Sequence, residues 1–307
     1  MEQLFGSEFL KELPVLKFAG RAAEGAAQAG MRKSRAKGSS VEFSDFREYL
    51  PGDDVRRLDW NAYARLGKLY MKLYMEEREG IFSLYVDLSP SMSYGMEPKA
   101  RQALRMAAVL SYMALQNQDR VKICLAGIAD QTALPLRQSF HGSAAFSKVL
   151  AYLQAAEEYR QEAIEKKQDE KKKGDIKVWE VLHRLPPDLG GNTILLSDFM
   201  PEDITEEVKY LRLFRKQMVL LFQVLAEEEL HPDFVGTNQL LDMENNGKMR
   251  ITLTAGLARA YQKELTGLRQ KLQRLAERYQ CHYQQVSTKE PTTAFLRLGM
   301  NRYWQHR

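Results

Sequence analysis

An apolar segment that ends in three oxygen-bearing side chains constrains this chain more than any other part of its sequence. Residues 81–86 read Ile-Phe-Ser-Leu-Tyr-Val, which is typical of a buried β-strand, and Asp87, Ser89 and Ser91 follow directly. Open α/β sheets bind ligands at the carboxyl ends of their strands. A carboxylate and two hydroxyls are hard donors of the type that suits Mg²⁺. The segment therefore predicts a divalent-cation site, and the alternative is a capped strand-to-helix turn without metal.

A second short apolar strand, expected at residues 192–198, also ends in oxygen-bearing side chains, Ser197 and Asp198. In a parallel sheet two such strand ends lie on the same edge, so Asp87 and Asp198 are expected to meet around one ion. Taken alone, Ser197 and Asp198 are explained as well by the N-terminal cap of a helix that starts near residue 201.

These motifs resemble those of two known protein classes. Asp-x-Ser-x-Ser with a distant Asp resembles the metal-ion-dependent adhesion site of the von Willebrand factor A fold, which also uses a distant Thr. A longer signature is similar to that of the bacterial family named domain of unknown function 58, and this resemblance extends over residues 37 to 307. The signature comprises Gly-Ser-Ser-Val-Glu-Phe (38–43), Arg-Glu-Tyr-Leu-Pro-Gly-Asp-Asp-Val-Arg-Arg-Leu-Asp-Trp (47–60), Ala-Arg (64–65) and Gly-Lys-Leu-Tyr (67–70).

The family resemblance implies a fold, a function and a ligand set. The implied fold is a von Willebrand factor A-like, Rossmann-like α/β domain, with a mostly parallel sheet flanked by helices and a small N-terminal appendage. The implied function is non-enzymatic protein binding, together with a MoxR-type AAA+ ATPase, in the assembly or maturation of a client protein. Asp87, Ser89 and Ser91 would be direct or water-mediated ligands of Mg²⁺, Mn²⁺ or Ca²⁺, and Asp198 the distant carboxylate. The ion would be bound at rest or only with a partner.

The threonine ligand of the wider fold has no obvious counterpart. Thr193 lies at the start of the strand that ends at Asp198, and five extended residues separate the two by ~16 Å. Ser143 is the better candidate, because it follows His141-Gly142 and precedes an expected helix at residues 144–155. Ser139 is its rival.

The family signature is dense in charged and aromatic residues. These residues either recognise a partner or form an ion-pair network that fixes the segment, for which bidentate Arg–carboxylate pairs are well suited. The candidates are Arg47, Asp53, Asp54, Arg56, Asp59 and Trp60.

Length and patterning predict three regions in the 307 residues. Residues 1–36 are expected to be a peripheral helical start with a basic linker, residues 37–80 the signature segment packed on the main domain, and residues 81–307 the main α/β domain. Within the last region we expect helices at 98–118, 144–155, 175–185 and 202–215, strands at 120–128, 192–198 and 217–225, a hairpin turn at Asn246-Gly247, and then a long helix.

Composition and missing motifs exclude several function classes. A net charge of +5 does not require a nucleic-acid partner, and no apolar run approaches the ~20 residues of a membrane span, so we expect a cytoplasmic protein. Neither a Gly-x-Ser-x-Gly elbow nor a phosphate-binding loop occurs. The remaining enzymatic alternative is a Mg²⁺-dependent aspartyl-phosphate phosphatase with Asp87 as nucleophile, although Ser89 occupies the position of its usual second acid.

Overall fold

The computed structural model describes residues 4–15, 41–76 without 52, 56 and 57, 80–128, 134–166, 177–200 without 189, 217–232, 236–241 and 248–293. It contains two compact units, one formed by Met1–Ala27 with Gly80–Arg307 and the other by Gln28–Glu79. The division lies one residue from the boundary predicted after residue 80.

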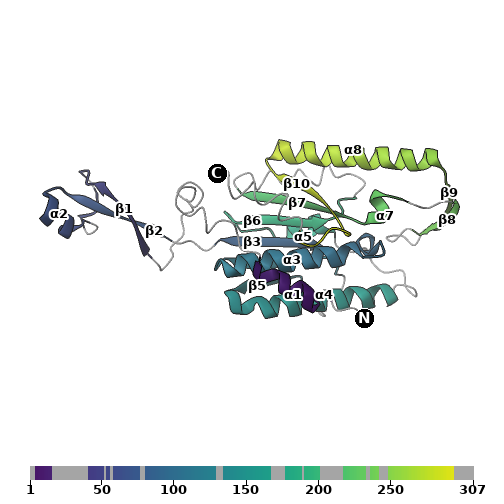
Figure 1. Cartoon of the computed structure of the whole chain (residues 1–307), viewed down its shortest axis with the longest axis horizontal. Helices are drawn as coiled ribbons and strands as arrows, with labels where there is room; N and C mark the ends of the chain where they lie inside the picture. Colours follow the sequence, from purple (N-terminus) through teal and green to yellow (C-terminus); the bar gives the residue numbers. More distant parts are fainter. Residues whose placement is uncertain are drawn as a thin grey trace. The chain divides into compact units, whose positions relative to one another are not determined.

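The larger unit contains a six-stranded sheet with the order β10-β7-β6-β3-β4-β5 (Figure 1). All neighbouring strands are parallel except β5, which runs antiparallel to β4. The mostly parallel α/β class with flanking helices is thus confirmed, and it is compatible with a Rossmann-like fold. The strands are β3 (Ile81–Asp87), β4 (Arg120–Ala126), β5 (Arg137–His141), β6 (Asn192–Ser197), β7 (Met218–Leu225) and β10 (His282–Ser287).

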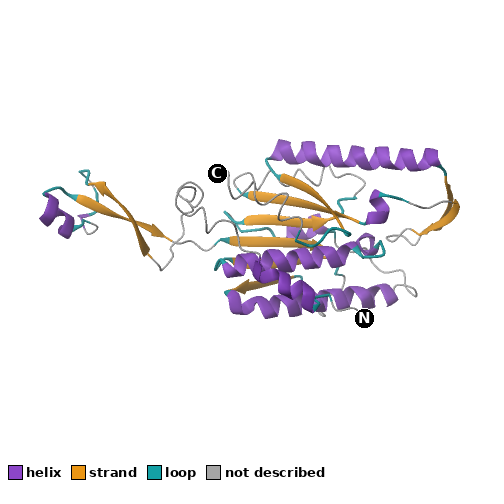
Figure 2. Ribbon diagram, in the orientation of Figure 1, coloured by secondary structure: helices purple, strands orange, loops and turns teal. Residues whose placement is uncertain are grey.

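Helices cover both faces of this sheet, which is why its central strands are apolar almost without interruption. Leu84 and Val86 of β3 face the core under α3 (Lys99–Gln116) and α4 (Phe146–Lys166). Tyr85 belongs to the opposite core. The helices of that face are α5 (Val178–Arg184) and α8 (Ala255–Tyr279) (Figures 1 and 2). Small, fully buried residues on α3, such as Ala103 and Ala107, let this helix lie close to the sheet.

The strand order reverses between β3 and β6. From β3 the chain proceeds to β4 and β5, and after α4 it returns to β6 on the other side of β3 before continuing to β7. Such a switch point is where open α/β sheets bind ligands. Asp87 and Asp198 lie at or just after the carboxyl ends of these two strands.

Several connecting elements complete the larger unit. The β8 (Gly236–Leu241) and β9 (Lys248–Leu253) strands pair antiparallel around the predicted hairpin turn. That turn and the helix expected at 202–215 lie outside the described residues. Among the described helices none is both long enough and apolar enough to cross a membrane. The short elements are η4 (Pro90–Ser93), η5 (Ser143–Ala145) and α7 (Glu227–Leu230).

The segment around the N-terminal helix α1 (Ser7–Glu12) packs on the main core through its flanking residues Leu4 and Leu13, which corrects the expectation of a peripheral start. Leu4 and Leu13 are only 1% and 2% exposed within the core that contains α3, and Arg105 Nε donates to the Leu4 carbonyl at 3.1 Å. Burial of these two apolar side chains stabilises the packing of the segment on the core. The basic linker lies outside the described residues.

The smaller unit consists of β1 (Val41–Glu48) paired antiparallel with β2 (Tyr70–Glu76), and α2 (Trp60–Leu66) between them in the chain. Asp59 caps α2, because its carboxylate accepts from the backbone N–H groups of Asn61 and Ala62. The helix ends at Gly67, whose φ of 66° suits glycine.

The burial of Leu4 beside the N-terminal helix predicts a stability effect. Leu4→Ala should lower the free energy of unfolding by about 2–4 kcal/mol, because it leaves a cavity in the core. Leu10→Ala is the matched control, since Leu10 lies on the same segment but is 39% exposed. Urea denaturation measures both, and equal effects of the two changes would contradict the placement of α1.

Candidate metal site

Asp87 is held by hydrogen bonds at the end of β3. Its Oδ1 accepts from the backbone N–H of Ser89 at 2.9 Å, and its Oδ2 accepts from Ser197 Oγ at 2.6 Å. The Asp87 side chain is buried. Both groups that donate to it are neutral. The parallel pairing of β3 and β6 brings Ser197 to Asp87, although 110 residues separate them in sequence.

The two hydroxyls of the Asp-x-Ser-x-Ser motif lie together on the loop that follows. Ser89 Oγ and Ser91 Oγ are 3.2 Å apart, within hydrogen-bonding distance. This loop passes tightly over the end of β4: the Leu88 N–H donates to the Ala126 carbonyl at 3.1 Å, and Gly127 has φ +79°. A Cβ at Gly127 would lie 2.5 Å from the Ser89 backbone nitrogen, so only glycine fits there.

Asp198 is buried beside this loop and is fixed through several of its atoms. Oδ1 accepts from the Met200 N–H at 3.2 Å, and its backbone carbonyl accepts from Gln223 Nε2 at 2.9 Å. The following Phe199 adopts φ 50°, which is unusual for a bulky residue and marks a tightly constrained turn at the site. Asp198 thus stays at the strand end instead of extending into solvent.

Two charged residues that were absent from the sequence prediction complete the site. Lys99, at the start of α3, is 1% exposed, and its Nζ lies 2.8 Å from Asp198 Oδ2 and 2.7 Å from Glu229 Oε1. Glu229 belongs to α7, directly after β7, and its other oxygen accepts from the Ala226 N–H at 2.8 Å. The position of Glu229 after a third parallel strand is a signal that could have identified it, whereas Lys99 at the first position of α3 carries no such signal.

Burial and repulsion make the charge of Asp87 unfavourable. Burial, and next the neighbouring Asp198 carboxylate, raise the pKa of Asp87 above its ordinary value. Burial alone would lower the pKa of Lys99, but attraction by Asp198 and Glu229 outweighs it and raises that pKa. A further cation close to Asp87 would therefore stabilise its charged form.

The donor set fits a hard cation, with a limited number of charged ligands. The described residues contain no cluster of three or more His, Cys, Asp or Glu placed to hold a metal. An ion here would be held by Asp87 and Asp198 with the hydroxyls of Ser89 and Ser91. Oxygen-only coordination of this type suits Mg²⁺, Mn²⁺ or Ca²⁺ and not zinc, for which nitrogen and sulfur ligands are usual.

Ser143 is not part of this site, so its prediction as the threonine substitute is wrong. The antiparallel β5 strand pairs His141 with Arg120, which is also the partner of Ile81 at the start of β3. Ser143 follows His141 and so lies at the opposite edge of the sheet, ~20 Å from Asp87 by strand rise. Ser139 pairs with Lys122 and is excluded in the same way.

Thr193 is also distant from the site, as expected from its position in the chain. It pairs with Ser83, four residues before Asp87, which corresponds to ~13 Å along the strand. The described residues therefore supply no threonine ligand at the expected position.

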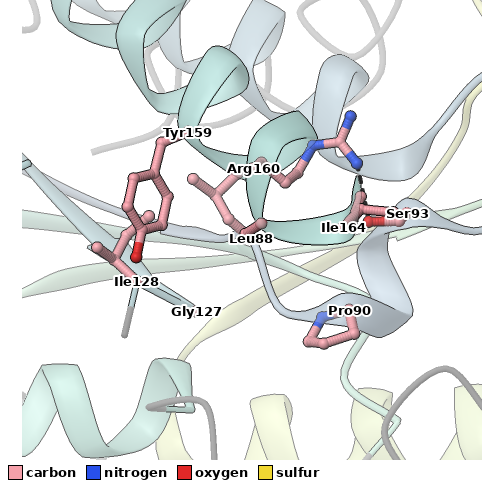
Figure 3. A pocket seen from close by; sticks show the side chains of 9 residues that line it. Leu88, Pro90, Ser93, Gly127, Ile128, Tyr159, Arg160 and Ile164 are labelled. Carbon is pink, nitrogen blue, oxygen red and sulfur yellow. Dashed lines mark hydrogen bonds between the residues drawn. The ribbon is translucent and has the colours of Figure 1, made fainter. Parts of the chain in front are cut away.

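Helix α4 supports the loop from its other side, around a small pocket of about 30 Å³ that has room for little more than water (Figure 3). Arg160 Nη1 donates to Ser93 Oγ at 2.8 Å, and the same guanidinium forms a two-bond ion pair with Glu157. Leu88 and Pro90 line the pocket. The pocket therefore positions the loop and is too small for an organic ligand.

The described signature residues make separate local contacts within the smaller unit. Arg47 Nη2 lies 2.6 Å from Asp53 Oδ1, and Asp53 Oδ2 accepts from the Leu50 N–H. Asp59 caps α2, whereas Trp60 is 63% exposed. Asp54 also takes part in polar or electrostatic contacts. Arg56 lies outside the described residues.

Both cysteines, Cys124 and Cys281, are buried and form no disulfide. Burial raises the pKa of the Cys124 and Cys281 thiols to about 12, so neither carries appreciable thiolate at neutral pH. They are structural and not reactive residues.

Comparison with known families and proteins agrees with the motif pattern. The model of the family described as protein of unknown function DUF58 matches residues 45–271. The chain belongs to the DUF58 family. It is also 26% identical over 215 residues to uncharacterised proteins of Mycobacterium bovis and Mycobacterium tuberculosis, covering 68% of this chain and 62% of theirs. The chain thus matches less than two thirds of the length of these relatives.

The close packing at Gly127 predicts that alanine there disturbs the candidate site. Gly127→Ala should lower the free energy of unfolding by more than about 2 kcal/mol, because the strained φ and the clash with the loop add together. Gly142→Ala is the matched control: its φ is +77°, but nothing lies within 4 Å of a Cβ there. Equal losses of stability in chemical denaturation would contradict the described packing.

Proposed function

We propose that this DUF58 protein is a non-enzymatic protein-binding module that uses a divalent cation at the ends of β3 and β6. The observation that carries the proposal is the buried Asp87 carboxylate, whose pKa Asp198 helps to raise, beside two hydroxyl oxygens at the switch point of the sheet. The arrangement resembles the metal-ion-dependent adhesion site of the von Willebrand factor A fold, without a threonine ligand among the described residues.

An ion at this site would retain positive charge. The hydroxyls of Ser89 and Ser91 are neutral ligands, and Asp198 already shares its charge with Lys99. A divalent ion so held favours an incoming carboxylate in its open coordination position, or water when no partner is present. The proposed mechanism is therefore recognition of an Asp or Glu side chain on a partner protein, with Mg²⁺ as the most suitable ion.

The partner is proposed from the family resemblance alone. A MoxR-type AAA+ ATPase would bind the module and supply any ATP hydrolysis, and a client protein would be assembled or matured by the pair. A phosphatase with Asp87 as nucleophile is the competing function, but Ser89 occupies the position of its usual second acid.

The proposed site predicts that Asp87→Asn raises thermal stability in chelator and removes the stabilisation by a divalent ion. Because the pKa of Asp87 is raised, its contribution to stability is complete below the ordinary value of 3.8 and is lost as pH rises. At pH 7 in chelator, Asp87→Asn should therefore raise the Tm, by about 2–4 °C. In Mg²⁺ or Mn²⁺ the parent should gain stability that the variant does not gain.

The control for this experiment is Glu158→Gln, which removes the same charge from an exposed site on α4. It should change neither the Tm in chelator nor the gain in Mg²⁺. The metal site would be contradicted if the parent protein showed no calorimetric binding of Mg²⁺ or Mn²⁺. It would also be contradicted if the Asp87→Asn variant bound these ions as tightly as the parent does. A beryllium fluoride adduct, or phosphatase turnover that is lost in Asp87→Asn, would support the enzyme instead.

A further inference from the structure

Among the described residues of the site, Lys99 is the one whose charge opposes the proposed function. It is almost fully buried, and its ammonium lies between two carboxylates, 2.8 Å from Asp198 Oδ2 and 2.7 Å from Glu229 Oε1. A buried lysine is rare unless it is paired, so the neighbouring carboxylates maintain its charge. The question is what this fixed positive charge does to a site that is proposed to hold a cation.

The carboxylates of Asp87 and Asp198 would offer a bound ion different amounts of negative charge, because Lys99 already pairs with Asp198. Lys99 occupies one oxygen of Asp198, whereas the hydrogen-bond donors to Asp87 are the neutral groups of Ser89 and Ser197. A divalent ion bound to Asp87 would thus meet one full negative charge and a second that is already neutralised. It would also lie close to the ammonium, which repels it.

We propose that Lys99 is an internal counter-cation that competes with the divalent ion for Asp198, so that the ion binds firmly only when a partner supplies a further carboxylate. This inference rests on the proposed function, since it concerns the same site. Lys99 is here a positioning residue: it holds Asp198 at the strand end when no ion is bound, and it limits the affinity for metal. Metal and partner then bind cooperatively. The ion supplies the positive charge that attracts the partner's carboxylate, and this carboxylate supplies the negative charge that Lys99 has neutralised at Asp198.

The same lysine connects the site to α7, whose three successive glutamates each hold a different segment. Glu229 binds Lys99, and Glu228 Oε1 accepts from the Met96 N–H at 3.0 Å on the loop before α3. Glu227 accepts from Ser287 Oγ at 2.9 Å at the end of β10. An ion that draws Asp198 away from Lys99 leaves the ammonium to Glu229, so that the lysine keeps a buried partner in both states.

The test measures Mn²⁺ affinity by calorimetry in variants that change this charge. The double variant Lys99→Met with Glu229→Gln removes the ammonium together with one of its carboxylates, and thus does not leave two buried acids unpaired. It should bind Mn²⁺ at least about tenfold more tightly than the parent, because Asp198 is then available to the ion. Glu229→Gln alone is the matched control, and it should bind no more tightly than the parent.

The second arm tests the cooperation with a carboxylate, with acetate as the probe and chloride at equal ionic strength as its control. Acetate should tighten Mn²⁺ binding by the parent more than by the double variant. This comparison with chloride is also made on the parent alone, which keeps the inference falsifiable if the double variant does not fold: a parent whose Mn²⁺ affinity is the same in acetate and chloride would overturn it.

The outcomes separate this inference from the proposed function. A folded double variant that binds Mn²⁺ no better than the parent, while Asp87→Asn abolishes binding, leaves the metal site standing and reduces Lys99 to a structural ion pair. If neither the parent nor the double variant binds Mn²⁺, the proposed function and this inference are both wrong.

Discussion

The placement of the buried Asp87 carboxylate close to a second buried carboxylate, Asp198, is the constraint on which the rest of the site depends. Two like charges at adjacent strand ends destabilise the fold unless donors and cations surround them. Ser197 and the Ser89 backbone bind one carboxylate, and Lys99 neutralises the other. The structure therefore gives up some stability at the switch point of the sheet, as functional sites commonly do.

Much of this site follows from the sequence, because parallel strands place their carboxyl ends on one edge. That rule brings Asp87 and Asp198 together before any coordinates are known. It fails for Ser143, whose strand returns antiparallel, so that the following helix begins at the opposite edge.

Lys99 and Glu229 were harder to predict for a different physical reason. Hydrophobic periodicity identifies α3 by its apolar residues and gives no sign that a charged residue at its first position is buried. Its partners come from residues far away in the sequence, on two other segments. The burial of Leu4 and Leu13 was missed similarly, because the short segment around α1 carries too few residues to reveal its packing partner.

The central claim is that Asp87, Ser89, Ser91 and Asp198 enclose one divalent cation. Anomalous diffraction from crystals soaked in Mn²⁺ tests this most directly, because it locates the ion without any assay of function. The account predicts one strong peak within about 2.6 Å of an Asp87 oxygen and of at least one of the two serine hydroxyls. A well-ordered site without a peak, or a peak confined to other surface carboxylates, would contradict it.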